Sequence, residues 1–268
     1  MKHRLLVAAS LAISSMPVFS VPAFAADRMT DRDVKALVAR IEDDRDKFDN
    51  ALDDELKNKI LRDSTGEVDV KRFLNNFQES IDRLEESLKP GYAGSSEAGT
   101  LLKQGSALER YFRAQPGGTK GESEWNRLAS DLKLLAAVYG TDFPVGENAT
   151  FRRIGDKEVA DTTKLLEKSA QQLKKTLDSD LKTDPSIDSA SRGAIVQEAD
   201  QLSKDAKVLR ERVSDGKPSS AEADQVMSRA TKLHAFIQTH QVPASASVWS
   251  GARPQLETVA AAYRIQRP

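Results

Sequence analysis

The chain has 268 residues with a formal charge of −1, and it contains no cysteine. This charge argues against a nucleic-acid partner, because proteins that bind nucleic acids carry a basic surface. Charged residues make up 30% of the chain and aromatic residues only 6%, a composition that favours long amphipathic helices over a β-sandwich.

Residues 1–25 have the features of a secretory signal peptide. A basic start at residues 2–4 precedes an apolar run at residues 5–13, and the sequence AFA at residues 23–25 has the small-x-small form of a cleavage site. The apolar run is too short to span a bilayer, which takes about 20 apolar residues. No later segment approaches a transmembrane span, so we expect an exported chain without a membrane anchor.

Cleavage is expected after Ala25, which leaves a mature chain from Ala26 to Pro268. Loss of Lys2 and Arg4 with the leader takes the formal charge from −1 to −3. The periplasm of a Gram-negative bacterium is the expected compartment, and secretion beyond the periplasm stays open. The mature chain must derive its stability from packing, because it has no cysteine for the disulfides that are common in exported proteins.

Apolar residues spaced by three, four and seven positions predict helices in the first half of the mature chain. These helices are expected over Asp31–Lys59, Val70–Leu88, about Ser96–Arg113 and Trp125–Tyr139. Thr30 is expected to cap the first helix, with Asp33 as the partner in a capping box. Ser123 and Gly140 are expected to begin and end the fourth helix.

The second half of the chain repeats this pattern. At an offset of 125 positions the aligned apolar pairs include Val34/Val159, Ile41/Leu166, Phe48/Leu173, Phe77/Leu202 and Leu108/Leu233. At an offset of 124, the residues Trp125, Leu132, Ala136, Ala137 and Tyr139 align with Trp249, Leu256, Ala260, Ala261 and Tyr263. Four helices that align in order predict an all-α fold: a tandem duplication of two antiparallel four-helix bundles after the signal peptide.

The expected boundaries follow from this repeat: a first bundle over residues 26–140, a linker over 141–155 and a second bundle over 156–268. The linker contains Phe143 and Phe151, which we expect to pack against both bundles and to set the angle between them. The second copy has Pro254 where the first has Ser130. A proline there either kinks the last helix or delays its regular start to about that point.

Trp125, Tyr139, Trp249 and Tyr263 are the candidate pocket or interface residues. Trp125 and Tyr139 fall on one helical face with Leu132 and Ala136. The simpler interpretation is that each Trp and Tyr pair anchors the fourth helix in the core of its bundle. The alternative is that these side chains line a ligand pocket or a partner groove.

Residues that often carry chemistry form no recognised arrangement. His234 and His240, the only histidines of the mature chain, lie six positions apart and are expected to point to different sides of a helix, so no metal site is expected. The acids between Glu42 and Glu55 alternate with Arg and Lys, which predicts a solvated face with local ion pairs. Nucleophile and nucleotide-binding motifs are missing. The sequences SSEAG and SSAEA are expected to supply serine helix caps. We therefore predict no catalytic residue and no cofactor.

These features favour a non-enzymatic exported helical protein that binds a protein or another envelope component through a bundle surface or the groove between bundles. One alternative is a small-molecule or cofactor binder with a pocket in a bundle near the Trp/Tyr helices. A second alternative is a periplasmic chaperone-like stress protein. An enzyme is the weakest case, and buried polar residues close together in a cleft would speak for it.

Overall fold

The computed structural model describes residues 28–58, 60–63, 66–114, 120–182, 184 and 186–265. This part of the chain is all-α apart from one short hairpin. The predicted signal peptide lies outside the described residues. Among those residues, no helix has both the length and the apolar character that crossing a membrane requires.

The first half of the chain forms the N-terminal unit, whose long helices enclose one hydrophobic core. Its elements are α1 (Asp31–Ala51), α2 (Asp54–Lys57), β1 (Ile60–Asp63), β2 (Gly66–Asp69), α3 (Val70–Ser87), α4 (Ser95–Ala114) and α5 (Glu122–Val138). Helix α1 contacts α3 and α5, and α4 also contacts α3 and α5, so each long helix has two long helices as neighbours.

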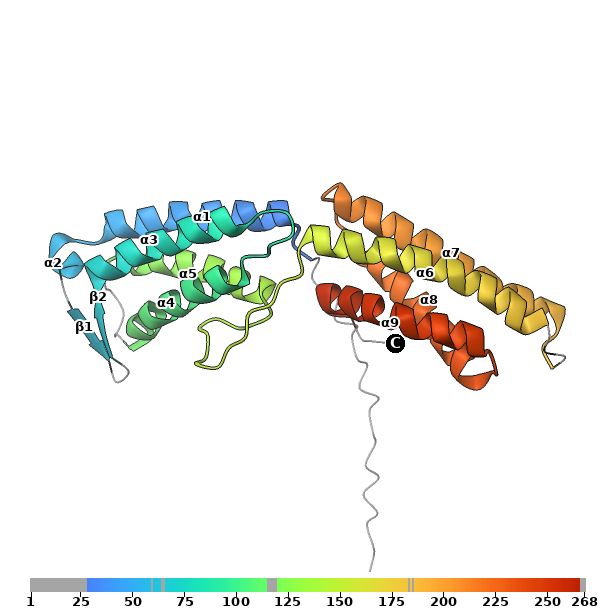
Figure 1. Ribbon diagram of the computed structural model, residues 1–268. Helices are drawn as coiled ribbons and strands as arrows, with labels where there is room; N and C mark the ends of the chain where they lie inside the picture. The colour runs from blue at the N-terminus through green and yellow to red at the C-terminus, as the bar shows by residue number, and fades with distance from the viewer. Residues whose placement is uncertain are drawn as a thin grey trace, which may run out of the picture.

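The second half forms the C-terminal unit around a separate core. Its elements are α6 (Asp156–Lys182), α7 (Ser189–Ser214), α8 (Ser220–Thr239) and α9 (Pro243–Tyr263). Helix α6 contacts α7 and α9, and α8 also contacts α7 and α9, which is the same order of neighbours as in the N-terminal unit. Figure 1 shows the two units end to end, with the beginnings of α1 and α6 meeting at the junction.

The first predicted helix is too long in the sequence analysis. Helix α1 ends at Ala51, and Leu52 takes an extended conformation while its side chain stays buried in the core. The acidic residues that follow favour helix starts over helix interiors, and the short helix α2 begins there. The antiparallel hairpin that follows pairs Ile60 with Asp69 and Asp63 with Gly66, and the sequence analysis did not predict it.

The observed helix ends can be compared with the predicted helix caps. The Thr30–Asp33 capping box is confirmed, because each side chain accepts the other residue's backbone N–H. The prediction that Ser123 caps the fourth helix is wrong. The N-cap of α5 lies two residues earlier, at Gly121, which has a left-handed φ of 82° and makes no side-chain cap. Gly140, with a φ of 80°, follows the last turn as predicted.

The linker aromatics pack on the N-terminal unit. Phe143 belongs to its buried core, and Phe151 packs against that core from the outside. Gly99 of α4 makes room for the Phe151 ring, since a Cβ there would lie 2.7 Å from it, whereas a Cβ on Gly105 of the same helix would meet Leu132 at 2.7 Å before Phe143 at 3.4 Å. The two linker aromatics are therefore seated on one unit and do not pack against both, contrary to the expectation. The end of the linker, at Arg153 and Ile154, contacts the segment before α1.

Helix α9 begins at Pro243 and runs through Pro254 to Tyr263. The expectation that Pro254 delays the regular start of this helix is therefore wrong. Pro243 occupies the first turn, where the missing N–H of proline has no intrahelical partner to lose.

Candidate ligand cleft between the two helical units

The two tryptophans are core side chains with satisfied N–H groups. Trp125 is fully buried and stacks on Phe112 with ring centroids 5.6 Å apart. Its indole N–H donates to the carboxylate of Glu109 at 2.7 Å. The indole N–H of Trp249 donates to Nδ1 of His234 at 3.0 Å. Glu109 and His234 lie 125 positions apart, so the hydrogen-bond acceptor recurs at the same place in each unit.

The two tyrosines are also buried, and each hydroxyl crosses to a neighbouring loop or helix start. The hydroxyl of Tyr139 donates to the carbonyl of Ala93 at 2.6 Å. The hydroxyl of Tyr263 shares a 2.7 Å hydrogen bond with Oγ of Ser219. Burial raises the pKa of both phenols above the ordinary value, so both remain neutral at physiological pH. Ser219 makes no side-chain cap for α8, contrary to the prediction.

Two arginine–aspartate pairs join the units. Nη1 of Arg28 lies 2.6 Å from a carboxylate oxygen of Asp156, and Nη2 of Arg153 lies 2.5 Å from a carboxylate oxygen of Asp31. Both guanidinium side chains are almost fully buried, with exposed fractions of 8% and 4%. Each also donates to a backbone carbonyl of the opposite segment, Arg28 to Ile154 and Arg153 to Met29.

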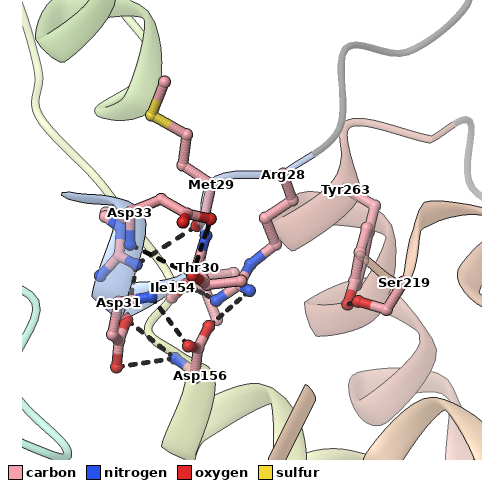
Figure 2. A network of polar contacts seen from close by, with 10 residues as sticks. Arg28, Met29, Thr30, Asp31, Asp33, Ile154, Asp156, Ser219 and Tyr263 are labelled. Atoms are coloured by element: carbon pink, nitrogen blue, oxygen red, sulfur yellow. Dashed lines mark hydrogen bonds and ion pairs between the residues drawn. The ribbon is translucent and has the colours of Figure 1, made fainter. Parts of the chain in front are cut away.

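The same two carboxylates bind the helix beginnings reciprocally. The backbone N–H of Asp31 donates to Asp156 at 2.8 Å, and the backbone N–H of Asp156 donates to Asp31 at 3.1 Å. Figure 2 shows these two carboxylates facing each other between the starts of α1 and α6. A negative charge at a helix N-terminus is stabilised by the unpaired N–H groups and the helix dipole. Each unit thus supplies the anion that binds the first turn of the other.

This junction was not predicted from the sequence, although the sequence contains a signal for it. The segments RMTD at residues 28–31 and RIGD at residues 153–156 align at the offset of 125 found for the helices. Both contain Arg-x-x-Asp directly before an amphipathic helix. The alignment marks the four charged residues as equivalent pairs, but it does not reveal that the two segments contact each other.

A cleft of about 510 Å³ lies beside this network. It is bordered by the last turns of α5 and α9, by the end of the linker and by the residues before α1. The lining residues are Arg28, Met29, Leu134, Ala137, Val138, Gly140, Arg152, Arg153, Ile154, Ala261, Ala262, Tyr263 and Arg264. Of the four candidate aromatics, Tyr263 lines the cleft, whereas Trp125, Tyr139 and Trp249 do not.

The cleft wall carries positive charge. Arg28 and Arg153 are paired with aspartates, whereas Arg152 and Arg264 are solvent-exposed. The Arg264 guanidinium donates to the carbonyl of Ala137 in the other unit. No hydrogen bond or ion pair connects the Arg152 guanidinium to another residue in the described part of the chain. The described lining residues include no Asp or Glu.

The other predicted chemical groups lie elsewhere. His234 is bound to Trp249, while Nδ1 of His240 faces the carbonyl of Phe236 at 2.9 Å. The acids of α1 make the local ion pairs that were expected, such as those of Asp43 and Asp44 with Lys47. In the described ranges, no group of three or more His, Cys, Asp or Glu residues is arranged to hold a metal ion.

Comparison with protein-family models, curated proteins and solved structures finds no match for this chain. The function must therefore be argued from the geometry of the cleft and its surroundings.

Proposed function

We propose that this chain is an exported, non-enzymatic binding protein that holds an envelope component in the cleft between its two helical units. The leader-like residues 1–25 support export to the periplasm. The observation that carries the binding function is the cleft itself, whose volume of about 510 Å³ falls within the ~300–1,000 Å³ typical of ligand sites.

The two units are, in this proposal, duplicated four-helix bundles over residues 26–140 and 156–268. The support comes from equivalent contacts in both. The helices have the same order of neighbours, the tryptophan N–H groups bind Glu109 and His234 at aligned positions, and the Arg-x-x-Asp segments bind each other reciprocally. A cleft between duplicated units arises from their mutual contact, so its lining comes from both.

A cluster of buried polar residues beside a cleft also raises the possibility of an enzyme, and the roles of its members argue against it. Asp31 and Asp156 each accept a hydrogen bond from a guanidinium and one from a backbone N–H of the opposite unit. These hydrogen bonds all cross from one unit to the other, so the contacts of both carboxylates serve to hold the two units together. We therefore assign the cluster to the assembly of the two units.

The wall of the cleft supports binding. Leu134 is 43% exposed and lines the cleft beside Ala137 and Val138 of the same helix and Ala261 of α9. An exposed leucine alone needs no explanation. Here it is part of a concave apolar surface that includes residues from both units, which is the usual form of a small-molecule site.

The test is capture of a partner by the mature chain Ala26–Pro268 from periplasmic and envelope extracts, with mass spectrometry of bound proteins and small molecules. Leu134→Glu places a charge on the cleft wall. Leu165→Glu is the matched control, since Leu165 is 52% exposed and does not line the cleft. We expect a reproducible component that Leu134→Glu loses and Leu165→Glu retains. Equal capture by both variants would place binding outside the cleft and contradict the proposal.

A further inference from the structure

We infer that the ligand of this cleft is a single-chain amphiphile with an anionic headgroup, an inference that rests on the proposed binding function. The walls of the cleft are aliphatic. Leu134, Ala137 and Val138 of α5 lie on one side and Ala261 and Ala262 of α9 on the other. These are short aliphatic side chains, so both walls can make apolar contacts with an alkyl chain.

The lining of the cleft also carries positive charge. The pairing of Arg28 with Asp156 and of Arg153 with Asp31 neutralises the inner part of the cleft. Arg152 and Arg264 add two positive charges at exposed positions of the same lining. This occurs on a chain whose formal charge is −1. Arginine binds carboxylate and phosphate groups through several N–H donors at once, so an anion is the complementary headgroup.

Arg264 also has an unusual backbone conformation for an arginine. Its φ of 54° is left-handed, a conformation that a residue with a side chain adopts less readily than glycine does. The aligned residue of the other unit is Gly140, which adopts the same region readily. An arginine therefore stands where glycine is preferred, and its guanidinium spans the cleft to Ala137. Left-handed residues commonly end helices and are usually glycine, so the arginine that ends α9 is a point at which the two walls of the cleft differ.

Cleft shape favours an amphiphile over a protein partner. Stable protein interfaces bury about 800 Å² on each side and are usually broad. The apolar part of this site is confined to a hollow whose walls are the last turns of two helices. A single alkyl chain fits such a hollow, and its headgroup would remain at the arginines.

The experiment is calorimetric titration of the mature chain with dodecanoate, dodecyl phosphate, dodecyltrimethylammonium and dodecyl maltoside, each below its micelle concentration. We expect one anionic amphiphile per chain, bound at least tenfold more tightly than the cationic or neutral one. Shorter alkyl chains should bind up to about fourfold more weakly per methylene removed from the cleft. A preference for dodecanoate or for dodecyl phosphate would identify the headgroup as carboxylate or phosphate.

Variants locate the site. Arg152→Gln should weaken anion binding about tenfold, since charge-assisted hydrogen bonds are the stronger class. Folding should be unaffected, because the Arg152 side chain makes no hydrogen bond or ion pair with the described residues. Arg264→Gly should weaken binding similarly while relieving the backbone strain at position 264. Arg253→Gln is the matched control, because Arg253 is exposed on α9 outside the cleft lining.

Three results would overturn the inference, of which the first two are equal binding of all four amphiphiles and anion binding that Arg152→Gln and Arg264→Gly leave unchanged. Absence of any amphiphile binding would also overturn it. The proposed function would survive that last result if Leu134→Glu still abolished capture from the envelope extract. The two failures are therefore distinguishable.

Discussion

Removal of the Asp31 carboxylate should destabilise the protein far more than removal of an ordinary surface aspartate. Asp31 accepts hydrogen bonds from Arg153 and from the backbone N–H of Asp156, so Asp31→Ala breaks a contact between units and uncaps α6. It also leaves the guanidinium of Arg153, which is only 4% exposed, without its counter-ion.

The magnitude follows from these two losses. A hydrogen bond to a charged group contributes about 1.5–3 kcal/mol, and a helix N-cap about 0.5–2 kcal/mol. Asp31 is itself 33% exposed, so solvent screening reduces the first contribution. We expect Asp31→Ala to lower the free energy of unfolding by about 2–3 kcal/mol. Asp31→Asn keeps an oxygen for the α6 N–H and should cost about half as much.

The assay is urea denaturation followed by tryptophan fluorescence, which reports on both units because each contains one Trp. Asp156→Ala is the mirror variant and should give a similar loss, since Asp156 makes the same contacts in reverse. Asp178→Ala is the surface control, because its partner Lys182 is well exposed and the pair lies within one helix. The reciprocal junction would not stabilise the protein as we expect if Asp31→Ala lowered the free energy of unfolding no more than Asp178→Ala does. A wide difference between Asp31→Ala and Asp156→Ala would contradict the expectation in the same way.

Two further predictions concern the end of α5. Burial raises the pKa of Tyr139 above its ordinary value, so the stability from its neutral phenol is fully present below about pH 10 and is lost as the pH rises beyond that. Denaturation between pH 8 and pH 11 should therefore show a steeper alkaline loss for the native protein than for Tyr139→Phe, and equal slopes would contradict this. Gly140→Ala should lower the free energy of unfolding by about 1–2 kcal/mol, because alanine is strained at the φ of 80°. The nearest neighbour of the added Cβ, the Arg152 carbonyl oxygen at 3.8 Å, is too distant to cause a clash. Gly193→Ala lies at an open position inside α7 and should instead raise the free energy of unfolding by about 0.5–1 kcal/mol. Thermal melts that shifted the melting temperatures of Gly140→Ala and Gly193→Ala in the same direction would refute this reasoning.

The helices were predictable because the signal for them is local. Stripes such as Val34, Ile41 and Phe48 lie along one face of a single helix, and these side chains are buried as the pattern requires. Glycine at 140 likewise marks a helix end within a few residues. Errors arose where tertiary contacts decide, as at Ser219, whose hydroxyl pairs with a tyrosine 44 positions away and does not cap its own helix.

The cleft could not be predicted from the same signals. Arg28 and Asp156 are 128 positions apart, and neither has a helical or strand period that would pair it with the other. The linker aromatics were the more obvious candidates to set the angle between units. Phe143 and Phe151 instead pack on the N-terminal unit, where Gly99 of α4 leaves room for the Phe151 ring.

The proposed duplication suggests how structure and specificity are divided in this protein. Residues that match between the copies assemble the molecule: the tryptophans with their acceptors fix the cores, and the Arg-x-x-Asp segments fix the junction. Those contacts bring the last turns of α5 and α9 to the same cleft. Copies that matched at every position would give two equivalent walls. The difference between Gly140 and Arg264 breaks that equivalence at the cleft, because one helix ends in a glycine without a side chain and the other ends in a cationic arginine. Ligand specificity is therefore expected to depend on the positions where the two copies differ, and Arg264 is the first of these to exchange.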